Sequence, residues 1–140
     1  LEWLKGKNHC NMKKRLFLIR GIPGSGKTSL AEDIAEKICS ADDYHIVNGE
    51  YVFNPAILHK AHAWCERKCE RYMKCGVSKI AVANVFSKES HLKPYIELAY
   101  KYNYRVYSII VENRHGNVNI HGVDEKTINK MINRFNIKLK

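Results

Sequence analysis

The chain has 140 residues, and its 24 Lys and Arg residues against 14 Asp and Glu residues give a formal net charge of +10. Hydrophobic residues make up 45% of it, enough to build one core without disulfides or a structural metal. No apolar run approaches the roughly 20 residues of a membrane span, and lysines interrupt the N-terminal region where a signal peptide would lie. These features exclude a membrane protein and favour one intracellular domain, cytoplasmic or nuclear, without a membrane partner.

Short apolar runs alternate with helical patterns along the chain. The expected elements, in chain order, are a strand over 15–20, a helix over 27–37, a strand over 38–40, a helix over 55–76, a strand over 79–84, a helix over 87–102, a strand over 104–111 and a helix over 124–135. Asn54 is the expected cap of the second helix. Pro94 predicts either a later start or a kink in the third. We expect residues 113–123 to form a loop, because they hold two glycines and no periodic pattern.

This alternation of strands and helices predicts an α/β fold in three layers, with a parallel sheet of four to five strands and helices on both faces. Ligands bind such folds beyond the carboxyl ends of the strands. We therefore look for chemistry at residues 21–28, at Asp42 and Asp43, at Asn84 and after Val111. Residues 1–12 are expected to be an N-terminal extension or linker, and residues 13–140 the folded domain.

The cysteines predict a reduced protein rather than a disulfide framework, because their number is odd: Cys10, Cys39, Cys65, Cys69 and Cys75. His62, Cys65 and Cys69 have a spacing that could offer three ligands to zinc on a helix. The same two cysteines also continue an apolar stripe with Leu58, Ala61 and Tyr72. Because cysteine is commonly buried, we favour core packing and predict no structural metal.

Residues 21–28 read Gly-Ile-Pro-Gly-Ser-Gly-Lys-Thr and match the phosphate-loop pattern G-x-x-x-x-G-K-[ST] between a strand and a helix. The expected phosphate-binding residues are Gly21, Gly24, Ser25, Gly26, Lys27 and Thr28. Backbone N–H groups of the loop and the start of the helix turn toward an anion. Lys27 adds charge for the β and γ phosphates, and the Thr28 hydroxyl is the expected magnesium ligand. The loop predicts binding of ATP or GTP with Mg²⁺ and leaves the acceptor open.

Asp42 and Asp43 form the adjacent acidic pair that follows the second strand. Phosphoryl transfer to a hydroxyl needs a base on that hydroxyl, and an Asp at this edge of the sheet can reach it. An acidic pair in a solvated turn is the alternative interpretation.

The loop G-x-P-G-S-G-K-T, followed by Ser40-x-Asp42-Asp43-Tyr44, resembles the polynucleotide kinase branch of P-loop kinases. The resemblance is greatest to the NEDD4-binding-protein-2-like group and extends through residues 48–55, 61–65, 93–95 and 119–123. It implies a P-loop kinase-like fold for the whole domain and a 5′-hydroxyl of RNA or DNA as acceptor. Asp42 matches the residue that serves as general base in that branch, and Lys27 stabilises the transferred charge.

The chain departs from the family pattern at three positions. His45 stands where some members have an arginine that engages nucleic-acid phosphate. Ala83 stands where relatives have an aspartate at the end of the third strand, and Val118 replaces a lid arginine. Arg114 is the candidate substitute for that arginine and is counted with Asp42 and Lys27 among the candidate catalytic residues. The P-loop domain of 2′,3′-cyclic nucleotide phosphodiesterase has a similar second-strand segment.

The excess of basic residues favours a polyanionic acceptor. Several lie along the long helix, namely Lys60, Arg67, Lys68, Arg71 and Lys74, followed by Lys79, Lys88 and Lys93. A solvated helix face is the competing explanation. The tyrosines at 95, 100, 102, 104 and 107 could stack bases, but packing in the sheet or core is the favoured interpretation for most of them.

Three functional hypotheses remain. The first is an NTP-dependent 5′-hydroxyl polynucleotide kinase with Asp42 as general base. The second is a catalytically degenerate domain that binds nucleotide or RNA, favoured by the residues at 45, 83 and 118. The third is a kinase for a small nucleoside-type hydroxyl. The sequence identifies no protein partner.

Overall fold

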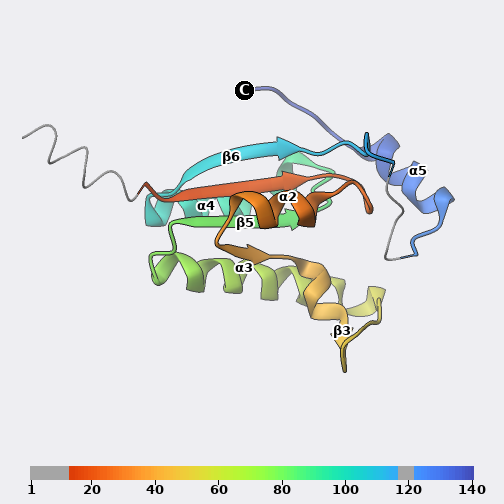
Figure 1. The fold of residues 1–140 in the computed structure, drawn as a ribbon, viewed down its shortest axis with the longest axis horizontal. Helices are drawn as coiled ribbons and strands as arrows, with labels where there is room; N and C mark the ends of the chain where they lie inside the picture. Colours follow the sequence, from red (N-terminus) through yellow and green to blue (C-terminus); the bar gives the residue numbers. More distant parts are fainter. Residues whose placement is uncertain (1–12, 117–121) are drawn as a thin grey trace, which may run out of the picture.

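A four-stranded parallel sheet forms the centre of the molecule (Figure 1). The computed structural model describes residues 13–116 and 122–140. The strands are β1 (Arg15–Arg20), β2 (Lys37–Cys39), β5 (Lys79–Asn84) and β6 (Arg105–Ile110), arranged in the order β2-β5-β1-β6. All three pairings are parallel, so the α/β class and the expected strands are confirmed. The expected extension over 1–12 lies outside the described residues.

Helices cover both faces of this sheet because β1 and β5 point alternate apolar side chains to opposite sides. On one face, Leu16, Leu18, Ile80 and Val82 belong to the core that α3 (Leu58–Lys74) and α4 (Lys93–Tyr102) cover. On the other face, residues such as Ile19 and Ala81 pack against α2 (Lys27–Ile34). The three expected layers are therefore present.

The remaining elements lie near the carboxyl ends of the strands. The 3₁₀ turn η2 (Ala41–His45) follows β2 and leads into a small antiparallel hairpin of β3 (Ile46–Val47) and β4 (Glu50–Tyr51). A second 3₁₀ turn, η3 (Pro55–Ile57), precedes α3, and a third, η4 (Glu89–His91), precedes α4. Helix α5 (Glu125–Arg134) lies at the end of the sheet toward which the strand arrows point (Figure 1).

Three expected helix boundaries need correction. The third helix does not begin at residue 87. A 3₁₀ turn comes first and α4 starts at Lys93, so Pro94 occupies the first turn, where its missing N–H costs nothing. The first helix ends at Ile34 instead of residue 37, because Lys37 already belongs to β2. The long helix begins at Leu58 instead of Pro55, and its N-cap is Ile57, which makes no side-chain hydrogen bond. Asn54 caps η3 instead, where its side chain accepts from the Ala56 N–H.

The buried face of α3 differs slightly from the expected stripe. Ala61, Cys65, Cys69 and Met73 are buried, which confirms core packing for the two cysteines. Leu58 is 40% exposed, so its place in the expected stripe was wrong. Leu58 is the first residue of α3 and lies at the end of the helix that does not cover the sheet. No helix in the described part of the chain combines the length and apolarity that a bilayer crossing requires.

Candidate phosphate-binding and acceptor site

The loop between β1 and α2 has the backbone of an anion cradle. Gly24 and Gly26 have φ values of 82° and 99°, which side chains rarely tolerate. The loop is tied to the sheet where the Gly21 N–H donates to Val85 O at 3.2 Å. Gly26 is the N-cap of α2, so the unpaired N–H groups of the first helical turn face the same space as the loop. This geometry suits a phosphate group.

Two side chains of the loop fit a bound phosphate. The Ser25 hydroxyl is fully buried and has no hydrogen-bond partner among the described residues. A methyl group on Gly21 would lie 2.5 Å from that oxygen, so the close packing requires glycine. The Thr28 side chain is exposed at the start of α2, where its hydroxyl can reach a metal ion bound with the phosphates. The residues present therefore fit the nucleotide that the motif predicts.

Lys27 is folded over the loop. Its Nζ donates to Ile22 O at 2.9 Å. Burial lowers the pKa of Lys27 to about 8, and the negative charge of Asp42 opposes part of that shift. The negative charge of Asp42 therefore acts on the Lys27 ammonium group.

Asp42 is positioned by its own turn and by the hairpin. The Ser40 side chain accepts from the Asp42 N–H at 3.3 Å and caps η2. The Tyr51 hydroxyl donates to Asp42 Oδ1 at 3.4 Å. Partial burial, together with the Asp42 charge, raises the pKa of Tyr51 to about 12, so this hydroxyl keeps its proton at neutral pH. Sequence reasoning assigned no role to Tyr51.

Asp43 faces a different environment from Asp42. Its Oδ2 lies 3.9 Å from Lys68 Nζ on α3. Partial burial raises the pKa of Asp43, although Lys68 opposes the shift. The two neighbouring carboxylates therefore have different partners, the Tyr51 hydroxyl for Asp42 and the Lys68 ammonium group for Asp43.

Two of the three positions that depart from the family pattern, Ala83 and His45, are buried. Ala83 is buried between β5 and α2. Asn84 is also buried, and its Oδ1 accepts from the Ala41 N–H at 2.9 Å, which ties β5 to the turn that carries Asp42. His45 is 1% exposed, and neither ring nitrogen has a hydrogen-bond partner among the described residues. In this arrangement His45 packs on Phe53, with ring centroids 5.1 Å apart, and does not face solvent.

The segment after β6 places a histidine, not the expected arginine, on the phosphate loop. Arg114 Nη2 pairs with Glu112 at 2.5 Å, and its side chain is 82% exposed. His115 Nε2 lies 2.8 Å from Ser25 O and next to Gly26. Ser25 and His115 are 90 positions apart in the sequence, which explains why no local motif indicated this contact. Val118 lies outside the described residues.

Two curated proteins are similar to this chain. Human NEDD4-binding protein 2 is 32% identical over 132 residues, covering 86% of this chain and 8% of that protein. The 2′,3′-cyclic-nucleotide 3′-phosphodiesterase of Mus musculus is 30% identical over 105 residues, covering 71% of this chain and 24% of the enzyme. The chain therefore spans a quarter or less of either relative. No protein-family model matches it.

Solved structures agree with the fold. The APS kinase of Mycobacterium tuberculosis superposes with a TM-score of 0.54 at 13% identity, covering 87% of this chain and 96% of that one. A chain of the Pnkp1/Rnl/Hen1 complex gives 0.58 at 14% identity, covering 84% of this chain and 38% of that one. Identities this low show the fold alone. Together with the phosphate loop and the similarity to NEDD4-binding protein 2, they show that the chain belongs to the P-loop kinase-like family.

Proposed function

We propose that this domain, residues 13–140, is an NTP-dependent phosphotransferase and that its acceptor is the 5′-hydroxyl of RNA or DNA. The observation that supports it best is the placement of the phosphate loop after β1 and of Asp42 after β2, both at the carboxyl ends of strands in one parallel sheet. A base for the acceptor and a cation for the phosphates then lie at one edge of the sheet. The similarity to a kinase and to a chain of the Pnkp1 complex agrees with this proposal.

Each residue of the site has a distinct task in this proposal. The backbone of residues 21–28 and the Ser25 hydroxyl bind the phosphates of ATP or GTP. The Thr28 hydroxyl is the residue that would hold Mg²⁺, which otherwise keeps water and phosphate ligands. Bound nucleotide supplies the γ-phosphoryl group. Asp42 accepts the proton of the acceptor hydroxyl, Tyr51 orients Asp42, and Lys27 neutralises charge on the phosphates.

The burial of Ala83 and His45 favours a second candidate, a domain that binds nucleotide or RNA without transfer. The family pattern has an aspartate at position 83 and an arginine at position 45, and in this chain neither position presents a charged side chain to solvent. In the described residues after β6, Arg114 is paired with Glu112 and no cation is seen on the phosphate loop from this segment. Retained nucleotide binding without turnover would identify this candidate.

The experiment is transfer of labelled γ-phosphate from ATP, in the presence of Mg²⁺, to 5′-hydroxyl RNA and DNA oligonucleotides and to a free nucleoside. Asp42→Asn is expected to abolish transfer while ATP affinity stays nearly unchanged, because this carboxylate acts on the acceptor. Asp43→Asn is the matched control, since the neighbouring carboxylate is engaged with Lys68, and it should keep most of the activity. Transfer to the nucleoside alone would favour a small-molecule kinase. Full activity of Asp42→Asn would remove Asp42 from the mechanism.

A further inference from the structure

Helix α3 carries a row of cations on its solvent face. Its core face consists of Ala61, Cys65, Cys69 and Met73. With 3.6 residues per turn, the opposite face is occupied by four exposed cations, which we call the α3 cationic stripe: Lys60, Arg67, Arg71 and Lys74. At 1.5 Å per residue the stripe extends over about 21 Å. It forms one nearly straight line parallel to the helix axis.

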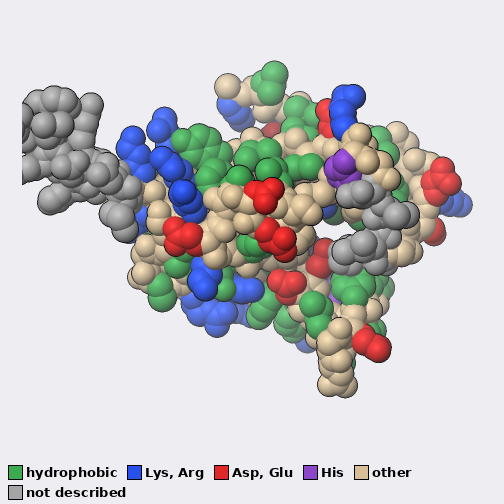
Figure 2. Space-filling model, viewed as in Figure 1, with side chains coloured by type: hydrophobic (Ala, Val, Ile, Leu, Met, Phe, Trp, Pro, Cys, Tyr) green, Lys and Arg blue, Asp and Glu red, His purple; other side chains and the backbone are tan. Residues whose placement is uncertain are grey.

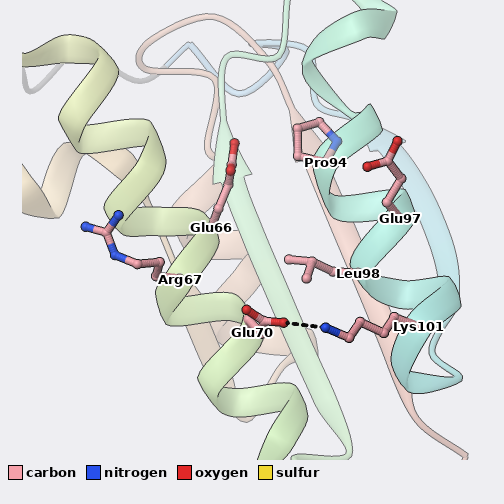
Figure 3. A pocket seen from close by; sticks show the side chains of 7 residues that line it. All are labelled: Glu66, Arg67, Glu70, Pro94, Glu97, Leu98 and Lys101. Carbon is pink, nitrogen blue, oxygen red and sulfur yellow. Dashed lines mark hydrogen bonds and ion pairs between the residues drawn. The ribbon is translucent and has the colours of Figure 1, made fainter.

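The acids of α3 lie beside this stripe. Glu66 and Glu70 line an open groove of about 360 Å³ between α3 and α4, and Arg67 lies at the rim of the same groove (Figure 3). Glu70 is occupied there, because its Oε2 accepts from the Tyr102 hydroxyl at 2.8 Å and from Lys101 Nζ at 3.5 Å. Among the described residues, no carboxylate lies within ion-pair distance of the four cations. Glu66 and Glu70 still act electrostatically on Arg67 and Lys74, so α3 offsets the charge of its stripe only in part.

Helix stability does not explain this arrangement fully. Arg67 and Arg71, at i and i+4, repel each other, as do Arg71 and Lys74 at i and i+3. The helix dipole favours cations in the last turn, which compensates at Arg71 and Lys74. It disfavours Lys60 in the first turn and does nothing for Arg67 near the middle. Glu70 compensates part of this repulsion, because it lies three residues after Arg67 and four before Lys74. Lys60 and Arg71 have no acid at such a spacing. The remaining excess of cations on this face points to an anionic partner.

The stripe is continuous with the turn that carries the candidate base. Lys68 lies on the flank of α3, with Nζ 3.9 Å from Asp43 Oδ2 and 5.1 Å from the centre of the Trp64 ring. Trp64 in turn packs on Tyr44 of η2, with ring centroids 5.7 Å apart. Lys and Arg side chains also gather over the C-terminal half of α3 (Figure 2). A polyanionic chain with one end at Asp42 can therefore pass η2 and continue along α3.

We propose that the α3 cationic stripe binds the sugar–phosphate backbone of the acceptor nucleic acid, downstream of the 5′ end that reaches Asp42. This inference rests on the proposed function and adds the surface that selects a polynucleotide over a nucleoside. A polyanion gains affinity at such a surface by releasing counterions. An anionic membrane is less suited to it, because the apolar face of α3 is buried in the core and cannot insert.

The test compares two variants that lose the same charge. Arg67→Gln/Arg71→Gln/Lys74→Gln removes three cations from the stripe. Lys13→Gln/Lys93→Gln/Arg105→Gln removes three exposed cations elsewhere. Binding of a fluorescent 5′-hydroxyl 12-mer is measured over a range of salt without nucleotide. Phosphate transfer to the 12-mer and to a dinucleotide is measured separately, and circular dichroism checks folding.

The stripe variant is expected to bind the 12-mer roughly 10- to 100-fold more weakly, with a log K against log salt slope reduced by about 2, because about three phosphate contacts are lost. The control variant should change affinity less than threefold, and neither should alter transfer to the dinucleotide. Equal losses in both variants, or tighter binding to phosphatidylserine vesicles than to the 12-mer, would overturn the inference. If wild type transfers no phosphate but the stripe-specific loss of binding persists, the proposed transferase function fails and the binding surface stands.

Discussion

Lys27 makes nucleotide binding dependent on pH. Burial lowers the pKa of this side chain from 10.5 to about 8, so the folded protein releases a proton there that the unfolded chain retains up to pH 10.5. Bound phosphates favour the ammonium form and raise the pKa again. Affinity for ATP is therefore expected to fall as pH rises through about 8, and binding above that pH should take up a proton.

Isothermal titration calorimetry at pH 8.5, in two buffers with different ionisation enthalpies, measures this proton uptake. In Lys27→Met the uptake should vanish and the affinity should be low and nearly independent of pH. Wild-type affinity that stays constant from pH 7 to 10 would contradict the argument, because the buried amine would then not change its charge in that range.

Tyr51 is expected to act through Asp42 rather than on substrate. Its hydroxyl donates to Asp42 Oδ1 at 3.4 Å and remains protonated, since its pKa is raised to about 12. Tyr51→Phe should lower kcat by roughly three- to tenfold, as expected for losing one weak hydrogen bond, while ATP affinity is unchanged. His45→Phe is the comparison variant, because it changes a buried ring that packs on Tyr51 and leaves the Tyr51 hydroxyl in place. A Tyr51→Phe enzyme with wild-type kcat would remove this positioning role.

At the scale of elements, Arg20 connects β1 to the segments that follow β5 and α5. The side chain is 2% exposed, and its Nε donates to Phe86 O at 3.0 Å and its Nη2 to Asn136 O at 2.6 Å. Nη1 reaches Glu89 Oε1 at 3.4 Å. Phe86 has a φ of 48°, so Arg20 also holds a left-handed residue in place.

Arg20→Met is therefore expected to lower the free energy of unfolding by about 2–4 kcal/mol, because the buried Phe86 carbonyl, the partly buried Asn136 carbonyl and the Glu89 carboxylate lose their donor. Urea denaturation measures the change. The double variant with Glu89→Gln should show less than the sum of the two single effects, since the residues share one network. A loss below about 1 kcal/mol would mean that water replaces the guanidinium at little cost.

The sequence predicted most of the elements because their signals are local. The apolar runs of β1 and β5 and the periodicity of α3 identify buried strands and an amphipathic helix without reference to the rest of the fold. The later start of α4 is one of the two outcomes that Pro94 predicted. The 3₁₀ turn before it was not predicted, since its sequence resembles a helical first turn. Within the site, the phosphate loop and Asp42 come from local motifs. Tyr51 lies in the hairpin and His115 lies in the segment after β6, so only the fold brings them to Asp42 and Ser25.

For the whole molecule, the carboxyl ends of the parallel strands meet at one edge, and the phosphate loop exists only when β1, α2 and the strands beside them are assembled. A nucleotide that binds this loop binds the folded chain and not the unfolded one. At 100 times its dissociation constant it should add about 2.7 kcal/mol to the free energy of unfolding and raise the melting temperature by roughly 10 °C. Differential scanning fluorimetry with MgATP should show this rise in the wild type and in Asp42→Asn, and little rise in Lys27→Met. A rise of equal size in Lys27→Met would mean that the nucleotide binds elsewhere than at the phosphate loop.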